Sequence, residues 1–169
     1  FAYLLLYTGC RRGEALALTW DDIDFDNNLI YINKQLQFQS NKPVIENFTK
    51  SKAGIRTVPM LENLRAALLP FKKNSGYVFS VNRNLLTSKQ FRDGWKSLGF
   101  SSTPHQFRHA YATTLYNAKI DAKTAQSLLG HSSVSVTLDV YTHISKNVAN
   151  SAKEQLNNYI SQSKISQKS

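Results

Sequence analysis

The sequence contains one cysteine, Cys10, among its 169 residues. A lone thiol excludes an internal disulfide and any zinc site built on several thiolates, and it fits a reducing compartment. No run of about 18 apolar residues occurs, so we expect no membrane span. The chain also lacks an HExxH pattern and a glycine-rich loop ending in Gly-Lys-Ser/Thr, so metal-dependent hydrolysis and nucleotide hydrolysis have no candidate residues.

Methionine is as scarce as cysteine, and the only one is Met60. The chain opens instead inside an apolar run, residues 1–6, which precedes the basic pair Arg11 and Arg12. A secretory signal peptide has the reverse order, with its basic residues first. We therefore interpret the sequence as a piece of a longer protein, without a signal peptide.

Acidic residues are few, with 11 against 21 lysines and arginines, which gives a formal charge of +10. Residues 61–169 carry +9 of this excess. Such a charge favours nucleic acid or another anionic surface as the partner. The 41% of hydrophobic residues exclude a disordered tail, and the length predicts about one domain.

The hydrophobic pattern predicts an α+β fold that is mostly α-helical with one small antiparallel β-sheet. A segment at 77–81 is a strand or a buried link. Strands are expected at 23–25, 29–38, 44–49 and 55–60. Helices are expected at 1–7, 12–18, 61–71, 87–98, 104–118 and 122–129, from Ser133 or Ser135 through Tyr141, and, as a separate weaker helix, at 150–163.

Several helix ends carry clear signals. Thr103, Pro104 and Gln106 form an N-cap, a first-turn proline and a capping-box partner. Asp121 is typical of a second N-cap, and Gly130 of a helix C-terminus. In the helix at 87–98 we expect Phe91, Trp95 and Leu98 to point inward.

The turn with Asp22, Asp24 and Asp26 resembles a calcium loop only superficially. An EF-hand needs Gly at its sixth position and Glu at its twelfth. Here Asn27 and Asn33 occupy those positions. We interpret the segment as an acidic turn in solvent, and no metal-binding residues are predicted.

The remaining candidates are cations, histidines and a tyrosine. His105 and Arg108 lie three residues apart on one helix face, and the first turn around His105 favours an anion such as phosphate. His131 follows Gly130 directly. For each residue alone a structural role is the more common one; Arg11, for example, could simply pair with Glu14.

Taken together, these residues resemble the tyrosine recombinases of the phage integrase family. Residues 8–14 (TGCRRGE) resemble its TGxRxxE box, and residues 105–109 (HQFRH) its HxxRH box. Residues 128–131 (LLGH) resemble its LGH box, and residues 141–143 (YTH) its nucleophile segment. Residues 49–59 (TKSKAGIRTVP) resemble the β-hairpin that carries the family's lysine. The five boxes occur in the family's order.

This resemblance implies the tyrosine recombinase catalytic-domain fold and a set of roles. Tyr141 would attack a scissile phosphate, with Lys50 as the alternative to Lys52 for the lysine. Lys50, Lys89 and Arg92 are candidates for contacts with the DNA backbone. The residues expected around the phosphate are Arg11, Lys52, His105, Arg108 and His131.

The implied activity is site-specific DNA recombination or integration through a 3′-phosphotyrosine intermediate, without metal, ATP or another cofactor. The implied partners are double-stranded DNA, further copies of the chain in a tetramer, and accessory directionality factors, in the bacterial cytoplasm at the nucleoid. A type IB topoisomerase-like nicking enzyme and a DNA-binding module that has lost catalysis are the alternatives.

The resemblance also implies how the chain is organised. Residues 1–169 would form a single C-terminal catalytic domain whose N-terminal DNA-binding domains lie outside this sequence. Residues 147–169 would form a tail that docks on a neighbouring protomer.

Overall fold

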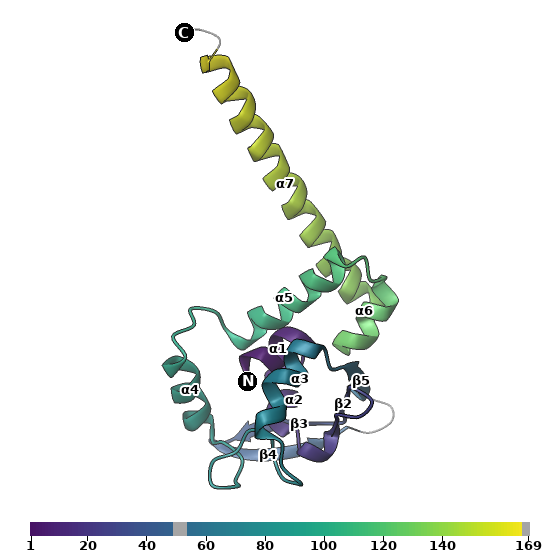
Figure 1. The fold of residues 1–169 in the computed structure, drawn as a ribbon, viewed down its shortest axis with the longest axis vertical. Coiled ribbons are helices and arrows are strands. Elements are labelled where there is room, and N and C mark those ends of the chain that lie inside the picture. Colours follow the sequence, from purple (N-terminus) through teal and green to yellow (C-terminus); the bar gives the residue numbers. More distant parts are fainter. Residues whose placement is uncertain (49–53, 167–169) are drawn as a thin grey trace.

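A computed structural model of the chain describes residues 1–48 and 54–166. The α+β prediction is confirmed, because helices dominate and the strands are short and antiparallel (Figure 1). The helices are α1 (Ala2–Thr8), α2 (Arg12–Ala17), α3 (Glu62–Leu68), α4 (Ser88–Ser97), α5 (Pro104–Asn117), α6 (Ala122–Leu129) and α7 (Val134–Ser166), with short 3-10 turns η1 (Trp20–Asp22) and η2 (Leu69–Phe71).

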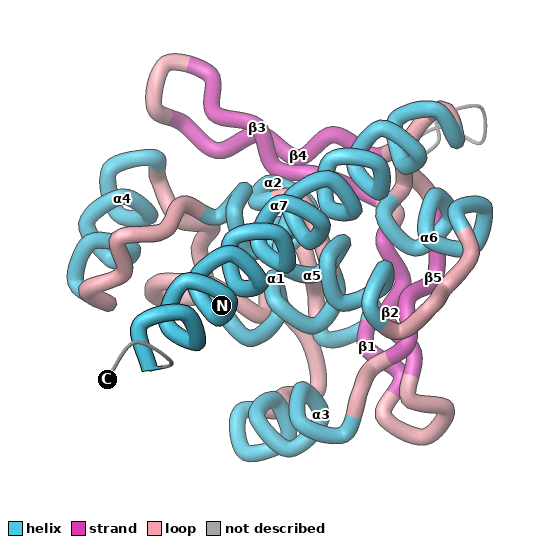
Figure 2. Tube along the Cα trace, turned by 90° about the horizontal axis from the view of Figure 1, so that it is seen from above, coloured by secondary structure: helices cyan, strands magenta, loops and turns pink. Residues whose placement is uncertain are grey.

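The described strands form two sheets rather than the single one expected. β1 (Ile23–Asp24), β2 (Leu29–Ile32) and β5 (Arg56–Pro59) make the first, in the order β1-β2-β5, and β3 (Lys34–Gln39) pairs with β4 (Lys42–Asn47) in the second. The break falls at Asn33, whose side chain donates to Asp22 Oδ1 at 3.0 Å. The predicted strand at 29–38 therefore bends there, and the β3–β4 hairpin projects to one side of the body (Figure 2).

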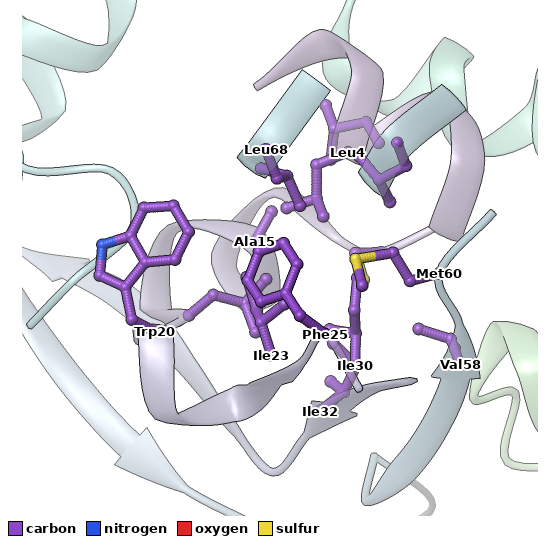
Figure 3. Packing of buried hydrophobic residues seen from close by; sticks show 14 residues of the cluster. Leu4, Ala15, Trp20, Ile23, Phe25, Ile30, Ile32, Val58, Met60 and Leu68 are labelled. Carbon is purple, nitrogen blue, oxygen red and sulfur yellow. The ribbon is translucent and has the colours of Figure 1, made fainter. Parts of the chain in front are cut away.

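The main core lies between α1, α2, α3 and the three-stranded sheet (Figure 3). Ile30 and Val58, paired across β2 and β5, are fully buried beneath Leu4 of α1. Burial of an aliphatic side chain of this size is worth about 1.5–3 kcal/mol, so this cluster fixes the sheet against α1 and α2. The core thereby holds the start of α2 and the strand β5 in a defined relation.

A second, smaller core joins α5, α6 and α7. Tyr111 and Leu115 of α5 pack against Ala125 and Leu129 of α6, and Tyr141 of α7 is packed at its edge. Because α1 also contacts α5, the two cores form one continuous body. Through this contact α5 connects the sheet half of the molecule to α6 and α7.

Helix α4 packs Phe91 and Trp95 inward as predicted. Both rings contact Phe1, with centroid distances of 5.4 and 6.1 Å. The inward placement of Leu98 was wrong, since Leu98 follows the last turn of α4 and is 52% exposed. Residues 77–81 form a link rather than a strand, although Tyr77 makes an isolated bridge with Thr19.

The C-terminal region differs most from expectation. The two predicted helices are one helix, α7, which is 33 residues long and extends away from the body (Figure 1). Neither glycine nor proline occurs between residues 134 and 166, so nothing in this segment removes a helical hydrogen bond.

The predicted helix ends at the site are confirmed. Thr103 caps α5, with the Gln106 side chain accepting from the Thr103 N–H at 2.6 Å. Asp121 accepts from the N–H groups of Lys123 and Thr124 at the start of α6, and Gly130 ends that helix in the left-handed region. The positions of α5 and α6 thus follow from local signals.

Candidate active site

A cavity of about 440 Å³ opens where α2 and α5 begin. Residues 10–13 line one wall, and residues 103–105 together with Arg108 line the other. Three predicted site residues lie there, namely Arg11, His105 and Arg108. Since both helices begin at this cavity, their unpaired N–H groups and positive dipole ends favour an anion inside it.

Arg11 is the N-cap of α2 and is bound to Glu14 of the same helix. Its backbone N–H donates to Glu14 Oε2 and its Nη1 to Glu14 Oε1, both at 2.8 Å. The second terminal nitrogen, Nη2, donates to the Gly130 carbonyl at 2.9 Å. The side chain stays 43% exposed, so the guanidinium is held at the cavity while remaining accessible.

Arg108 lies deeper and is almost fully buried. Its two terminal nitrogens donate to the carbonyls of Gly9 and Leu129, each at 2.6 Å. Burial, reinforced by the charge of Arg11, lowers the pKa of Arg108 to about 10. The guanidinium therefore stays charged at neutral pH in a position with little water to screen it.

Arg56 on β5 is a third buried arginine, and it was not among the predicted site residues. Its guanidinium forks onto Glu14, with Nη2 to Oε2 at 2.8 Å and Nη1 to Oε1 at 3.1 Å. Its Nε donates to the Leu128 carbonyl at 2.8 Å. Burial alone would raise the pKa of Glu14, but the hydrogen bond and charge of Arg56 outweigh it and lower that pKa, so the carboxylate stays ionised.

The C-terminus of α6 binds all three guanidiniums. Three consecutive carbonyls at the end of this helix each accept a hydrogen bond from a different arginine, and such carbonyls have no partner within the helix. Together with Glu14 these side chains form what we call the arginine cluster, whose three cations exceed its one carboxylate. The pairs are Arg56 with Leu128, Arg108 with Leu129 and Arg11 with Gly130.

Gly130 is required where α6 meets the cluster. Its φ is +66°, and a Cβ built there would lie 2.6 Å from Arg56 Nη1. His131 comes next and is fixed by its neighbours, with the Thr137 hydroxyl 2.9 Å from His131 Nδ1. Burial, followed by the charges of Arg108 and Arg11, lowers the pKa of His131 to about 4, so the imidazole is neutral at pH 7.

His105 lies in the first turn of α5 and lines the cavity beside Arg108. Its ring meets the His109 ring edge to face at a centroid distance of 4.6 Å. Burial and the neighbouring His105 and Arg108 lower the pKa of His109. The structure thus brings four predicted residues together, with Arg11, His105 and Arg108 lining the cavity and His131 directly after Gly130, whose carbonyl binds Arg11.

Tyr141 is not brought into the cavity. Its hydroxyl donates to the Ile120 carbonyl at 3.1 Å, in the connection between α5 and α6. The ring packs edge to face on Tyr116 at 5.3 Å. Burial and the charge of Asp121 raise the pKa of Tyr141. In this arrangement the hydroxyl of the predicted nucleophile is bound to a backbone carbonyl outside the cavity, and its catalytic role stays a prediction.

Of the other predicted DNA contacts, those that the structure describes do not line the cavity. Lys50 and Lys52 lie outside the described residues. Lys89 and Arg92 are exposed on α4, where Lys89 pairs with Asp93 at 2.7 Å. In the acidic turn Asp22 is buried and bound to Lys34 at 2.6 Å, so it does not face solvent as expected.

Sequence analysis missed two arginines. Arg12 lines the cavity, with its guanidinium above the rings of Phe38 and Phe91 at 5.7 and 5.5 Å. Arg56 had a detectable signal, because it alternates with Thr57 and therefore shares the inward face of β5 with Val58. A charge on an inward face requires a buried partner, and Glu14 between apolar residues of α2 was the matching signal.

Metal-ligand clusters and membrane-spanning helices are both absent from the described residues. Within residues 1–48 and 54–166, no group of three or more histidine, cysteine, aspartate or glutamate side chains is placed to hold a metal ion. No helix in the part that the structure describes is long and apolar enough to cross a bilayer.

Comparisons with known proteins agree with the geometry. A family model described as "Phage integrase family" matches residues 1–148. A protein named tyrosine recombinase XerC-like, from Caldanaerobacter subterraneus, is 32% identical over an alignment that covers 92% of this chain and 48% of the relative. The transposase from transposon Tn916 of Enterococcus faecalis is 29% identical, with 91% and 44% covered.

Solved structures show the same fold. The Tn1549 transposon integrase in complex with transposon right end DNA matches with a TM-score of 0.71 and 28% identity, covering 92% of this chain and 57% of that one. A crystal structure of XerA recombinase matches with a TM-score of 0.61 and 27% identity, covering 90% and 55%. The chain spans about half the length of the curated relatives it matches.

Proposed function

This chain belongs to the phage integrase family, and we propose that it forms the catalytic part of a site-specific DNA recombinase. One observation carries the proposal. Arg11, His105 and Arg108, from two helices far apart in sequence, line a single cavity. Two guanidiniums that are fixed and only partly hydrated can bind the non-bridging oxygens of one phosphate.

The proposed reaction is an exchange of phosphodiester bonds. The Tyr141 oxygen attacks the scissile phosphorus, its proton passes to His105, and the bond from phosphorus to the 5′-oxygen breaks. Lys52 protonates the leaving 5′-oxygen, with Lys50 as the alternative donor. The 3′-phosphotyrosine ester conserves the bond energy, so that attack by another 5′-hydroxyl rejoins the strand without ATP or metal.

The arginine cluster supplies most of the transition-state stabilisation in this proposal. Negative charge grows on the non-bridging oxygens as Tyr141 attacks, and Arg11 and Arg108 are already oriented by backbone carbonyls. Donors fixed in advance need no reorganisation when the charge develops, and one such donor is typically worth about 2.7–4 kcal/mol. Neutral His131 can add a hydrogen bond to the phosphate.

Cleavage further requires Tyr141 to change partners. Its hydroxyl now donates to the Ile120 carbonyl. We propose that DNA binding moves the first turns of α7 so that this hydroxyl exchanges the carbonyl for the scissile phosphate. A single neutral hydrogen bond has a net worth of about 1 kcal/mol, which the phosphate contacts can exceed.

The proposed partner is double-stranded DNA, as in the Tn1549 integrase complex. The charge of +10 favours this polymer, and Lys50, Lys89 and Arg92 are proposed to contact its backbone. Further copies of the protein, as a tetramer, and accessory directionality factors complete the proposed assembly. Its place would be the bacterial cytoplasm, at the nucleoid, where such DNA lies.

We propose that residues 1–169 form one catalytic domain and that residues 147–169 dock on a neighbouring protomer. The second half of α7 extends beyond the body, and four of its large apolar side chains are at least half exposed: Val148, Leu156, Tyr159 and Ile160. Deletion of residues 147–169 should weaken assembly on DNA. Unaltered synapsis and cleavage by the truncated protein would contradict the docking proposal.

A suicide DNA substrate tests the proposed reaction. Its nick lets the cleaved strand diffuse away, so the intact protein should accumulate a covalent adduct that survives SDS, in EDTA as well as in buffer. The Tyr141→Phe variant should form none. Tyr116→Phe is the matched control, since Tyr116 packs against Tyr141 but has no proposed chemistry. An adduct formed by Tyr141→Phe would refute the assignment of the nucleophile.

The same reagents separate the alternatives. A recombinase joins strands from two sites, whereas a topoisomerase-like nicking enzyme only relaxes supercoiled DNA. A DNA-binding module without catalysis would bind the substrate and give no adduct at all. The LGH box at residues 128–131 and the long predicted hairpin that includes residues 49–59 favour the recombinase.

A further inference from the structure

Arg56 connects more parts of the site than any predicted residue that the structure describes. It comes from β5, forks onto Glu14 of α2 and donates through Nε to the Leu128 carbonyl of α6. Its Nη1 also donates to the Gly54 carbonyl at 3.2 Å. The side chain is only 3% exposed, so Arg56 is shielded from solvent and is not placed to contact DNA.

The contacts of Glu14 show how Arg56 can act at a distance. Each oxygen of the Glu14 carboxylate accepts two hydrogen bonds, one from Arg11 and one from Arg56. The carboxylate plane is therefore set by the fork of Arg56, and Glu14 Oε1 in turn sets the direction of Arg11 Nη1. Bidentate guanidinium–carboxylate pairs fix orientation as well as distance, which a lysine cannot do.

The Arg56 guanidinium also binds the end of α6, through its Nε. Arg56 holds the Leu128 carbonyl, while Arg11 holds the Gly130 carbonyl two residues later. The end of α6 thus has a fixed distance from β5, and Gly130 leaves room for the Arg56 side chain. Arg11 is therefore bound to Glu14, which Arg56 also binds, and to the end of α6, where Arg56 binds the carbonyl two residues earlier.

We propose that Arg56 is a positioning residue for the DNA-cleavage reaction, one that orients the Arg11 guanidinium toward the scissile phosphate through Glu14 and the end of α6. This inference rests on the proposed function. It adds a residue of β5 to the reaction without giving it contact with substrate. A misplacement of reacting groups by about 1 Å can cost on the order of 100-fold in rate.

The test uses Arg56→Lys in the intact protein, because lysine keeps the buried charge that Glu14 needs but cannot fork. Arg65→Lys on α3 is the matched control, since the Arg65 side chain has no hydrogen bond or ion pair in the described part of the chain. Single-turnover adduct formation is measured on two suicide substrates, one with the normal scissile phosphate and one with a methylphosphonate there. The methylphosphonate lacks the charged oxygen that Arg11 is oriented to bind.

On the phosphate substrate we expect Arg56→Lys to slow adduct formation by about 10- to 100-fold, with the DNA dissociation constant changed less than about twofold. On the methylphosphonate the variant and the wild type should differ far less, because the orientation of Arg11 no longer matters there. Equal slowing on both substrates would mean a general structural defect and overturn the proposal, as would no slowing on either. If Arg56→Lys does not fold, Glu14→Gln, which keeps the shape of the carboxylate, must show the same dependence on the substrate.

The wild-type arm keeps the two proposals apart. No adduct from the wild-type protein would contradict the proposed function. A normal wild-type adduct, combined with an Arg56→Lys variant that cleaves both substrates at the wild-type rate, would contradict only the role of Arg56.

Discussion

The arginine cluster and the region around Tyr141 lie in the same body but are held in different ways. Every guanidinium of the cluster donates hydrogen bonds to at least two residues of the protein, and all three bind one helix end. Within the described residues Tyr141 has one hydrogen bond, to the Ile120 carbonyl, and one aromatic contact, on Tyr116, and it packs only at the edge of the second core. The groups proposed to bind phosphate are thus fixed in advance, and the proposed nucleophile is held by few interactions.

This difference separates the proposed binding of phosphate from the proposed cleavage, because the two depend on groups that are held in different ways. Buried, saturated groups stabilise the phosphate-binding half whatever the state of α7. A nucleophile held by a single hydrogen bond can leave its position at low cost. Mutations in the two regions should therefore separate effects on stability from effects on cleavage.

The largest expected effect is that of Glu14→Ala. It leaves Arg56 buried without its carboxylate, and breaking a buried ion pair in this way costs about 3–5 kcal/mol. The free energy of unfolding, from urea titration at pH 7, measures the loss. Glu62→Ala on α3 is the control. Because Glu62 is exposed, this substitution should lower the free energy of unfolding by less than about 1 kcal/mol. Equal losses for Glu14→Ala and Glu62→Ala would contradict the view that the arginine cluster is held firmly by its buried ion pair.

Arg108→Lys should come next. Lysine is a single cationic centre and cannot reproduce the separate bonds to the Gly9 and Leu129 carbonyls while it also faces a phosphate. We expect adduct formation to slow by about 100- to 1,000-fold in single-turnover assays at saturating DNA. A loss below tenfold would show that this guanidinium is not a preorganised donor.

Gly130→Ala should destabilise the protein by about 1–3 kcal/mol. The left-handed backbone is strained for alanine, and the new Cβ collides with Arg56. Gly94→Ala is the matched control, because Gly94 lies within α4 and its Cβ would meet open space. That change should instead stabilise by up to about 1 kcal/mol. The thermal unfolding midpoint should fall for Gly130→Ala and rise for Gly94→Ala, and shifts in the same direction would contradict the prediction.

A smaller effect should appear with pH at His131. Its pKa is lowered from 6.5 to about 4 in the folded protein, so the unfolded chain takes up this proton more readily. Stability should therefore fall as pH drops from about 6.5 toward 4, and the loss is complete below the folded pKa. Urea titrations at pH 7, 6 and 5 should show a shallower decline for His131→Asn than for the wild type. Parallel declines would mean that His131 carries no such shift.

The smallest effect on stability is expected for Tyr141→Phe, the variant that should abolish the adduct. It removes one hydrogen bond to Ile120 and keeps the ring on Tyr116, so the cost should not exceed about 1 kcal/mol. The urea midpoint of the purified variant measures it. A loss above about 2 kcal/mol would mean that Tyr141 is fixed as firmly as the arginine cluster.

The elements around the cavity could be predicted because their signals are local. The Thr103 cap with its Gln106 partner, the Asp121 cap and the Gly130 terminus each depend on residues within a few positions, and all three are as expected. The order of the five sequence boxes indicated the family without any knowledge of contacts.

Features that depend on distant partners could not be predicted in this way. The partners of Arg56 lie 42 and 72 residues away in sequence, and only the folded chain brings Glu14 and Leu128 to it. The direction of the Tyr141 hydroxyl likewise depends on a carbonyl 21 residues earlier. The break between the two sheets falls at Asn33, whose side chain binds Asp22, and the pattern of apolar residues does not reveal that contact.

The continuity of α7 has a mechanical consequence. At 1.5 Å per residue its 33 residues make a rod about 50 Å long, with Tyr141 near one end and the exposed Leu156, Tyr159 and Ile160 in the opposite half. A rod without proline or glycine resists bending and twisting. A partner bound to the C-terminal half of α7 can therefore rotate the helix as a unit. A small rotation of the whole helix changes the direction in which the Tyr141 hydroxyl points.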